Sequence, residues 1–208
     1  MISHKHKTVF VHIPKTGGQS VELAFLAEHG LAWRDRAPLL LRSNDDRALG
    51  PARLAHLYAH EYVSKGHLSA DDFDAYFKFA VVRDPYSRIV SSFNFRDHSF
   101  TSVRDFVEAA PDDEHEGHRR QVMPQVTYLF DAARTRFVVD RVLRFETLAQ
   151  DMSDVFRQVF GTDRPLPHRN AAVERRLTVE RLTRDDIAFV NETYSEDFLR
   201  LGYEIKPT

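Results

Sequence analysis

The sequence VFVHIPKTGGQS, residues 9–20, decides the fold of this chain. It begins as an apolar run typical of a buried strand, passes Pro14, and turns through Lys-Thr-Gly-Gly into the helical pattern VELAFLAEHG. In α/β proteins a strand, a glycine turn and a helix hold phosphate groups, because free N–H groups and the helix dipole favour an anion there. The lysine precedes the glycines, whereas an ATP-binding P-loop places its lysine after them.

Further apolar runs alternate with helical stretches along the rest of the chain. Short runs without strict alternation suit parallel strands that are covered on both faces. The strands are predicted at residues 8–13, 77–82, 136–140 and 142–145. We therefore expect an α/β fold, a three-layer αβα domain with a mainly parallel central sheet and a P-loop-like phosphate-binding turn. It forms a single domain over residues 1–208, because neither an internal repeat nor a low-complexity linker divides the sequence.

Helix ends and irregular segments complete this outline. Gly30 and Gly161 stand where left-handed C-caps are expected, and Thr183 is a candidate N-cap for a C-terminal helix. Residues 31–58 and 96–120 are irregular, and such insertions at the carboxyl ends of strands often shape substrate sites, although both also fit ordinary surface loops. Residues 59–67 are considered as a possible strand.

The composition excludes several classes of protein. The 208 residues carry a net charge of −2, which argues against a general nucleic-acid binder. Without cysteine there are no disulfides, thiolate metal sites or cysteine nucleophiles. No segment approaches the roughly 18 apolar residues of a membrane span, and the first strand begins too early to leave room for a signal peptide. A cytoplasmic location is the expectation.

A second segment, FKFAVVRDPYSRIVSSFNF at residues 77–95, also suits an anion. Its apolar strand delivers Arg83 to the carboxyl end, where ligands bind in open α/β sheets, while Asp84 can cap the next helix and Pro85 suits its first position. A guanidinium there suits bidentate phosphate recognition. An Arg–Asp ion pair that stabilises the turn is the alternative for this segment. For the first segment, the alternative is a tight turn with a surface lysine.

Together the two segments resemble the PAPS-dependent sulfotransferases of the carbohydrate type, the family of the heparan and chondroitin O-sulfotransferases and bacterial relatives. PAPS is 3′-phosphoadenosine 5′-phosphosulfate, and PAP is its desulfated product. The resemblance continues in MPQVTYL, VLRFETL, LPHRN and FLRLGY, and so spans almost the whole chain in order. It implies in-line sulfuryl transfer from PAPS without a metal. The lysine beside the bridging oxygen would stabilise the charge that develops on the leaving 5′-phosphate.

The resemblance also implies which residues bind the nucleotide. In the family the first motif binds the 5′-phosphosulfate and the second, of the form RDPxxRxxS, binds the 3′-phosphate. The LPHRN segment is expected near the 3′-phosphate and the adenine, although it also fits a solvated charge run. The cofactor-binding residues expected are Lys15, Thr16, Gly17, Gly18, Gln19, Ser20, Arg83, Ser91, Arg169 and Asn170.

The acceptor hydroxyl must lose its proton, and a positioned base helps this step. KGHLSADDF, residues 65–73, resembles the segment of the 2-O-sulfotransferases that holds their proposed histidine base, and it implies that His67 is catalytic together with Lys15. Glu61 and His60 are the alternatives, and a histidine that is merely hydrogen-bonded at a strand end is also possible. Glu146 is expected to be a structural carboxylate at a helix start.

The sequence does not identify the acceptor. Carbohydrate is the acceptor that the family implies; a lipid or another small molecule would leave the same traces. Trp33, Arg34, Arg36 and Arg42 are candidates for lining a sugar site. His115 and His118 stand among carboxylates without the spacing of a metal site. The family's eukaryotic members generally have an N-terminal anchor, and its absence here favours a bacterial-type soluble enzyme.

Two other function classes remain open. One is a P-loop kinase, for which RFVVD at residues 136–140 imitates a strand that ends in a Mg²⁺-ligating aspartate. The absence of the GxxxxGK[ST] motif counts against it. The other is a nucleotide-binding protein that has lost its catalytic activity. For this chain we expect no nucleic-acid partner and no membrane span. The sequence leaves its oligomeric state open.

Overall fold

A computed structural model describes residues 1–95, 99–113, 115–167 and 176–208. The strands are β1 (Ile2–Ser3), β2 (Thr8–Val11), β3 (Phe77–Val82) and β4 (Arg141–Arg144). The α-helices in these residues are α1 (Gly18–Glu28), α2 (Glu61–Ser64), α3 (Ala70–Ala75), α4 (Pro85–Phe95), α5 (Val103–Glu108), α6 (Gly117–Val122), α7 (Leu148–Phe160), α8 (Arg184–Thr193) and α9 (Ser195–Leu201). The 3₁₀ turns are η1 (Trp33–Asp35), η2 (Ala37–Leu39), η3 (Arg47–Leu49), η4 (Leu54–His56), η5 (Gln125–Tyr128), η6 (Phe145–Thr147) and η7 (Val179–Arg181).

The four strands form one sheet in the order β1-β2-β3-β4. The short β1 is antiparallel to β2, while β2, β3 and β4 are parallel, with Phe10 opposite Phe79 and Phe79 opposite Arg141. Because side chains alternate along a strand, Phe10 and Phe79 face one side of the sheet and Val11 and Ala80 the other. The mainly parallel sheet predicted from the sequence is confirmed.

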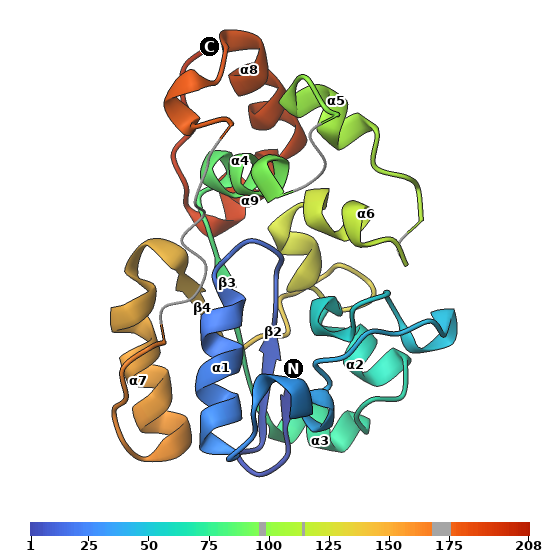
Figure 1. The fold of residues 1–208 in the computed structure, drawn as a ribbon, viewed down its shortest axis with the longest axis vertical. Coiled ribbons are helices and arrows are strands. Elements are labelled where there is room, and N and C mark those ends of the chain that lie inside the picture. The colour runs from blue at the N-terminus through green and yellow to red at the C-terminus, as the bar shows by residue number, and fades with distance from the viewer. Residues whose placement is uncertain (96–98, 114, 168–175) are drawn as a thin grey trace.

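Helices cover both faces of this sheet. On one face, the strand side chains pack with α1 and α7 through residues such as Phe25 and Phe156. On the other face they pack with α2 and α3, including Tyr62 and Phe73, and with the η5 turn. Figure 1 shows α1 and α7 on one side of the strands and α2 and α3 on the other. The structure thus has the three layers that the sequence predicts.

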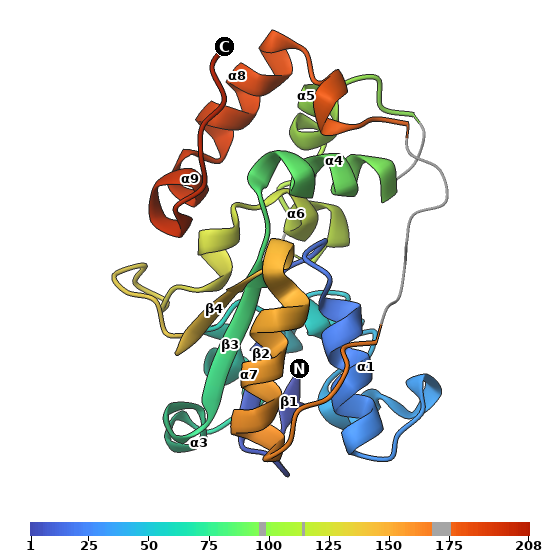
Figure 2. The same ribbon diagram turned by 90° about the vertical axis from the view of Figure 1, so that its left-hand side faces the viewer.

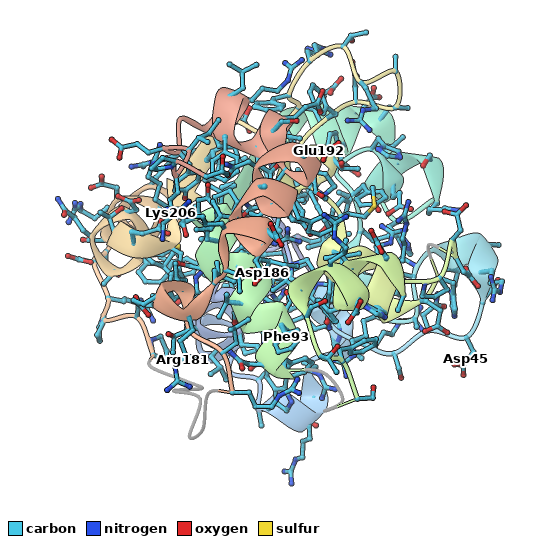
Figure 3. All side chains as sticks on the ribbon, turned by 90° about the horizontal axis from the view of Figure 1, so that it is seen from above. Asp45, Phe93, Arg181, Asp186, Glu192 and Lys206 are labelled. Carbon is cyan, nitrogen blue, oxygen red and sulfur yellow. The ribbon has the colours of Figure 1, made fainter. Side chains whose placement is uncertain are left out.

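A group of helices lies beyond the carboxyl ends of the strands. α4, α5, α8 and α9 share a separate apolar cluster that contains Phe93, Phe106 and Phe198. Figure 2 shows this group above the sheet, and Figure 3 views it from above, with Phe93 of α4 and Asp186 of α8 near the middle. Within the described ranges, no helix has both the length and the apolar character needed to cross a bilayer.

Several local predictions are confirmed. The strand expected at 77–82 has the predicted bounds, and β2 and β4 fall within one or two residues of theirs. Gly161 ends α7 in the left-handed conformation with φ 74°. Thr183 caps α8 in a reciprocal capping box with Asp186.

Two strand predictions are wrong. Residues 136–140 form no strand, since their ladder contacts amount to an isolated bridge between Phe130 and Phe137. Residues 61–64 form helix α2 instead of a strand, because the Glu61 carboxylate accepts the Tyr58 N–H and thereby favours a helical start. The segment 96–120 also contains two short helices, α5 and α6.

Candidate functional site

The turn between β2 and α1, residues 12–17, is called the phosphate loop here. Lys15 and Gly17 have left-handed backbone conformations, with φ 71° and 83°, and this double reversal turns the chain into α1. The start of α1 has no side-chain cap and no acidic residue in its first turn. Its free N–H groups and the positive end of the helix dipole therefore face the loop without a compensating carboxylate.

Aromatic rings explain why both glycines are needed. A Cβ on Gly18 would lie 2.2 Å from ring atoms of His12, and one on Gly17 would lie 2.9 Å from the ring of Phe145. His12 is itself fixed, because its Nδ1 donates to Glu22 Oε1 of α1 at 2.6 Å and both side chains are buried. The absence of side chains at Gly17 and Gly18 thus leaves room for the rings of Phe145 and His12.

The remaining side chains of the first motif have different surroundings. The buried Thr16 hydroxyl donates to the Ile13 carbonyl oxygen at 2.8 Å, so its proton closes the loop from within. A contribution of Thr16 to an anion site would therefore come from its backbone N–H. Gln19 and Ser20 lie in the first turn of α1, and Ser20 is buried.

Lys15 is the cation of the phosphate loop. Its Nζ lies over the Phe95 ring at 3.9 Å from the centroid. Burial, and after it the nearby positive charge of Arg83, lower the pKa of the Lys15 ammonium to about 8. Within the described ranges no carboxylate pairs with Lys15, so an entering anion would supply its counter-charge.

Arg83 follows β3 and joins the same site. Its Nη1 donates to the Lys15 carbonyl oxygen at 3.2 Å, and its guanidinium lies 4.2 Å from the centroid of the Phe145 ring. The predicted cap of α4 is confirmed, since Asp84 Oδ1 accepts the Ser87 N–H at 2.8 Å and Pro85 is the first helical residue. The sheet therefore brings Lys15 and Arg83, which lie 68 residues apart, to one edge.

Two groups that sequence reasoning did not assign hold this edge together. Arg88, only 1% exposed, donates from Nε to the Pro14 carbonyl oxygen at 3.2 Å and from Nη2 to the Gln121 carbonyl oxygen at 3.0 Å. Gln125 accepts the Arg83 N–H and donates to the Arg83 carbonyl oxygen, both at 2.8 Å. Arg88 lies in the RDPxxRxxS segment and Gln125 in the MPQVTYL segment. Membership of these family segments was the sequence signal that could have identified them.

Gln125 is held in turn by Asp197 of α9. The carboxylate accepts the backbone N–H groups of Gln125 and Val126 at 2.9 and 3.0 Å. Glu146, expected at the start of a helix, also acts on this turn, because it accepts the Asp84 N–H at 2.8 Å and the Tyr203 hydroxyl at 3.1 Å. These contacts hold η5, η6 and the C-terminal segment around the turn that follows β3.

Of the three remaining residues that were predicted to contact the nucleotide, the structure describes one, Ser91. Ser91 lies in the second turn of α4 and is partly buried. Arg169 and Asn170 lie outside the described residues.

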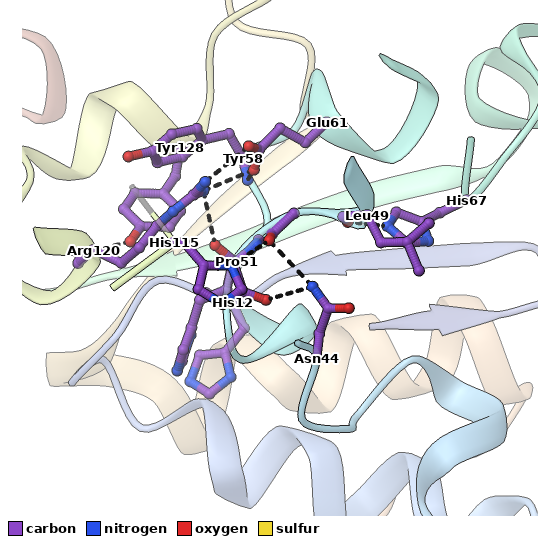
Figure 4. Close-up of polar contacts among 12 residues, drawn as sticks. His12, Asn44, Leu49, Pro51, Tyr58, Glu61, His67, His115, Arg120 and Tyr128 are labelled. Carbon is purple, nitrogen blue, oxygen red and sulfur yellow. Dashed lines mark hydrogen bonds and ion pairs between the residues drawn. The ribbon is translucent and has the colours of Figure 1, made fainter. Parts of the chain in front are cut away.

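Two of the predicted bases, His67 and Glu61, have hydrogen-bond partners of their own and are shown with their surroundings in Figure 4. His67 donates from Nε2 to the Leu49 carbonyl oxygen at 2.7 Å. Both oxygens of the buried Glu61 accept from Arg120, at 2.7 and 2.8 Å. His60 precedes α2, and its buried Nδ1 has no hydrogen-bond partner in the described part of the chain.

The two histidines considered for a metal have structural partners. His115 donates from Nδ1 to the Gly50 carbonyl oxygen at 3.0 Å, and the buried His118 donates from Nε2 to the Phe106 carbonyl oxygen at 2.8 Å. Among the described residues, no three or more His, Cys, Asp or Glu side chains are placed to hold a metal ion.

A comparison with known families places these residues in context. A model described as "Sulfotransferase family" matches residues 1–204. No curated protein and no solved structure matches the chain. The phosphate loop, the β3–α4 turn and the Gln125–Asp197 contact all lie inside the matched range.

Proposed function

This chain belongs to the sulfotransferase family, and we propose that it transfers the sulfuryl group of PAPS to an acceptor hydroxyl and releases PAP. The observation that carries the proposal is that Lys15 and Arg83, two cationic residues, lie together at a helix start that has no side-chain cap. Two cations and free N–H groups at one sheet edge suit a ligand with several negative charges. PAPS carries such charges at both its 5′ and 3′ positions.

The position of Lys15 suits sulfuryl transfer. In the proposed step the acceptor oxygen attacks sulfur, the bond between sulfur and the bridging oxygen breaks, and the electron pair stays on the 5′-phosphate of PAP. The Lys15 ammonium would stabilise this charge, and it is already poorly solvated, which strengthens the interaction. Arg83 and Ser91 would hold the 3′-phosphate, and Arg169 and Asn170 are proposed to contact the nucleotide.

A polar cavity supports a carbohydrate acceptor. It has a volume of about 150 Å³. It is lined by Arg47, Gly50, Glu61, Lys65, Asp113, His115 and Arg120. The charged side chains of this lining suit the hydroxyl and acidic groups of a sugar better than they suit an apolar ring. Trp33 is a weaker candidate for this site, because α1 carries the chain away from the phosphate loop before η1 begins (Figure 2).

The structure gives no support to the kinase alternative. Asp140, the aspartate of RFVVD, accepts the Lys78 N–H at 2.7 Å and pairs with Lys78 Nζ at 3.2 Å. Lys78 lies near the start of β3, whereas Arg83 follows its end. Asp140 therefore lies at the opposite end of β3 from the phosphate loop.

Thermal denaturation tests the choice of nucleotide. The full chain is heated with PAP in EDTA and, separately, with ATP and Mg²⁺. Ligand at 100 times its dissociation constant should stabilise the protein by about 2.7 kcal/mol. We expect PAP to raise the melting temperature in EDTA. A shift with ATP and Mg²⁺ alone would overturn the proposal.

A further inference from the structure

One histidine that the sequence did not single out lies beside the phosphate loop. His56, at the end of η4, donates from Nδ1 to the His12 carbonyl oxygen at 3.1 Å. A carbonyl oxygen only accepts, so the Nδ1 atom carries the proton and, in the neutral ring, Nε2 carries the lone pair. The hydrogen bond thus fixes the tautomer in which Nε2 can accept a proton.

A closed series of contacts places His56 at the site. Arg120 donates from Nη1 to the His56 carbonyl oxygen at 3.2 Å, and Gln121 follows Arg120 in α6. The Gln121 carbonyl oxygen accepts from Arg88, which also donates to Pro14 inside the phosphate loop. Two routes therefore connect His56 to the phosphate loop. Its Nδ1 bonds directly to His12, and its carbonyl oxygen bonds to α6, which Arg88 joins to Pro14.

The ring of His56 is also accessible and neutral. Within residues 1–95, 99–113, 115–167 and 176–208, its Nε2 has no hydrogen-bond partner, and the side chain is only partly buried. The pKa of His56 lies well below its usual value, because burial disfavours the imidazolium and His12 lies beside it, their ring centroids 4.6 Å apart. At neutral pH the ring is therefore uncharged, with the lone pair of Nε2 directed away from the bond to His12.

Two of the alternative bases, His67 and Glu61, are less available. His67 uses Nε2 to donate to Leu49, a residue of η3, and its hydrogen bonds within the described residues do not reach the phosphate loop. The Glu61 carboxylate accepts from both Arg120 nitrogens and from the Tyr58 N–H. Protonation of Glu61 during turnover would leave the buried Arg120 without its counter-ion, which costs several kcal/mol.

We propose that His56 is the general base of this enzyme and that its Nε2 takes the proton of the acceptor hydroxyl. The inference rests on the sulfotransferase function proposed above. As the acceptor oxygen bonds to sulfur, its proton passes to Nε2, and the electron pair of the breaking sulfur–oxygen bond stays on the 5′-phosphate near Lys15. The imidazolium then returns the proton to solvent, so the ring is regenerated without a further reactant.

A pair of conservative variants separates the catalytic role of His56 from its structural role. His56→Asn keeps a side-chain N–H that can reach the His12 carbonyl oxygen but lacks an acceptor in place of Nε2. His118→Gln is the matched control, because His118 also donates from a ring nitrogen to a carbonyl oxygen and does not line the cavity proposed for the acceptor. His67→Gln keeps an N–H for Leu49 and tests the rival base.

Each protein is titrated with PAP by calorimetry and is incubated with ³⁵S-labelled PAPS, with and without desulfated heparin and chondroitin, while PAP formation is measured. We expect His56→Asn to bind PAP within about threefold of the unsubstituted chain and to form PAP at least about 100-fold more slowly, the usual lower range for loss of a general base. His118→Gln should match the unsubstituted chain in both measurements.

The outcomes distinguish the two proposals. Unchanged PAP formation by His56→Asn, or a 100-fold loss in His67→Gln alone, would overturn the role of His56 and leave the sulfotransferase proposal standing. Equal losses of PAP affinity and of turnover in His56→Asn would also overturn it, since they indicate a structural role. Failure of the unsubstituted chain to bind PAP would overturn both proposals.

Discussion

The affinity for PAP should fall as the pH rises through the pKa of Lys15. In the folded chain that pKa is lowered to about 8, chiefly by burial and then by the charge of Arg83. The ammonium form predominates below this pH and the neutral amine above it. Because the phosphates of PAP have second pKa values of about 6, the ligand keeps its charge over this interval. Binding is therefore strongest below pH 8 and weakens above it.

The magnitude follows from the fraction of protein that carries the ammonium. With a pKa of about 8, Lys15 is about 90% protonated at pH 7 and about 10% at pH 9. If only the protonated form binds, the dissociation constant for PAP rises about tenfold over this interval, or about 1.4 kcal/mol. The bound anion should also raise the pKa of Lys15, so binding at pH 8 to 9 takes up protons.

Isothermal titration at pH 7, 8 and 9, in two buffers of different ionisation enthalpy, measures both the affinity and the proton uptake. Lys15→Arg is the control, because a guanidinium stays charged throughout this interval. Its affinity for PAP should be flat between pH 7 and pH 9. A flat profile for the unsubstituted chain, or the same tenfold loss in Lys15→Arg, would refute the role given to Lys15.

Three further predictions concern the framework of the site, and each is checked by chemical denaturation. Gly18→Ala should destabilise the fold by about 1–3 kcal/mol, since a ring lies 2.2 Å from the new Cβ. Gly30→Ala, with no atom within 4 Å, should cost only about 1 kcal/mol of backbone strain. Gln125→Ala should cost about 2–3 kcal/mol, because it removes two hydrogen bonds to the backbone of Arg83. Glu61→Gln breaks a buried ion pair and should cost about 3–5 kcal/mol, whereas Glu108→Gln in an exposed pair should cost under about 0.5 kcal/mol.

The controls define what would contradict these expectations. Equal losses for the two alanine variants would show that the His12 ring moves away freely and does not require a glycine. A negligible loss for Gln125→Ala would mean that other groups or water satisfy the turn after β3. Equal losses for the two glutamine variants would remove the distinction between the buried and the exposed pair.

The sequence predicted those parts of the fold that depend on local pattern. FKFAVV is uniformly apolar and ends at a charged turn, so the bounds of β3 follow from the sequence alone. RFVVD has the same kind of composition but forms no strand, because Asp140 bonds to both the N–H and the carbonyl oxygen of Lys78. Tertiary contacts of one aspartate there outweigh the preference of the apolar run.

The candidate site was predictable where a family motif marks a residue and not where distant segments meet. Lys15 and Arg83 were expected together, and their contact is present. The position of His56 depends on the path of residues 31–58, whose 3₁₀ turns carry little periodic signal. Its hydrogen bond to His12, 44 residues away, can be seen only in three dimensions.

Metal-independent sulfuryl transfer by this chain is tested most directly by the formation of PAP from PAPS in the presence of EDTA. The unsubstituted chain and Lys15→Ala are incubated with ³⁵S-labelled PAPS and desulfated glycans, and PAP and the labelled product are separated by chromatography. We predict labelled glycan and PAP in equal amounts, formed at least about 100-fold more slowly by Lys15→Ala, as expected when a charge-stabilising group is lost. Tight binding of PAP with PAPS left intact, or equal rates for the two proteins, would contradict it.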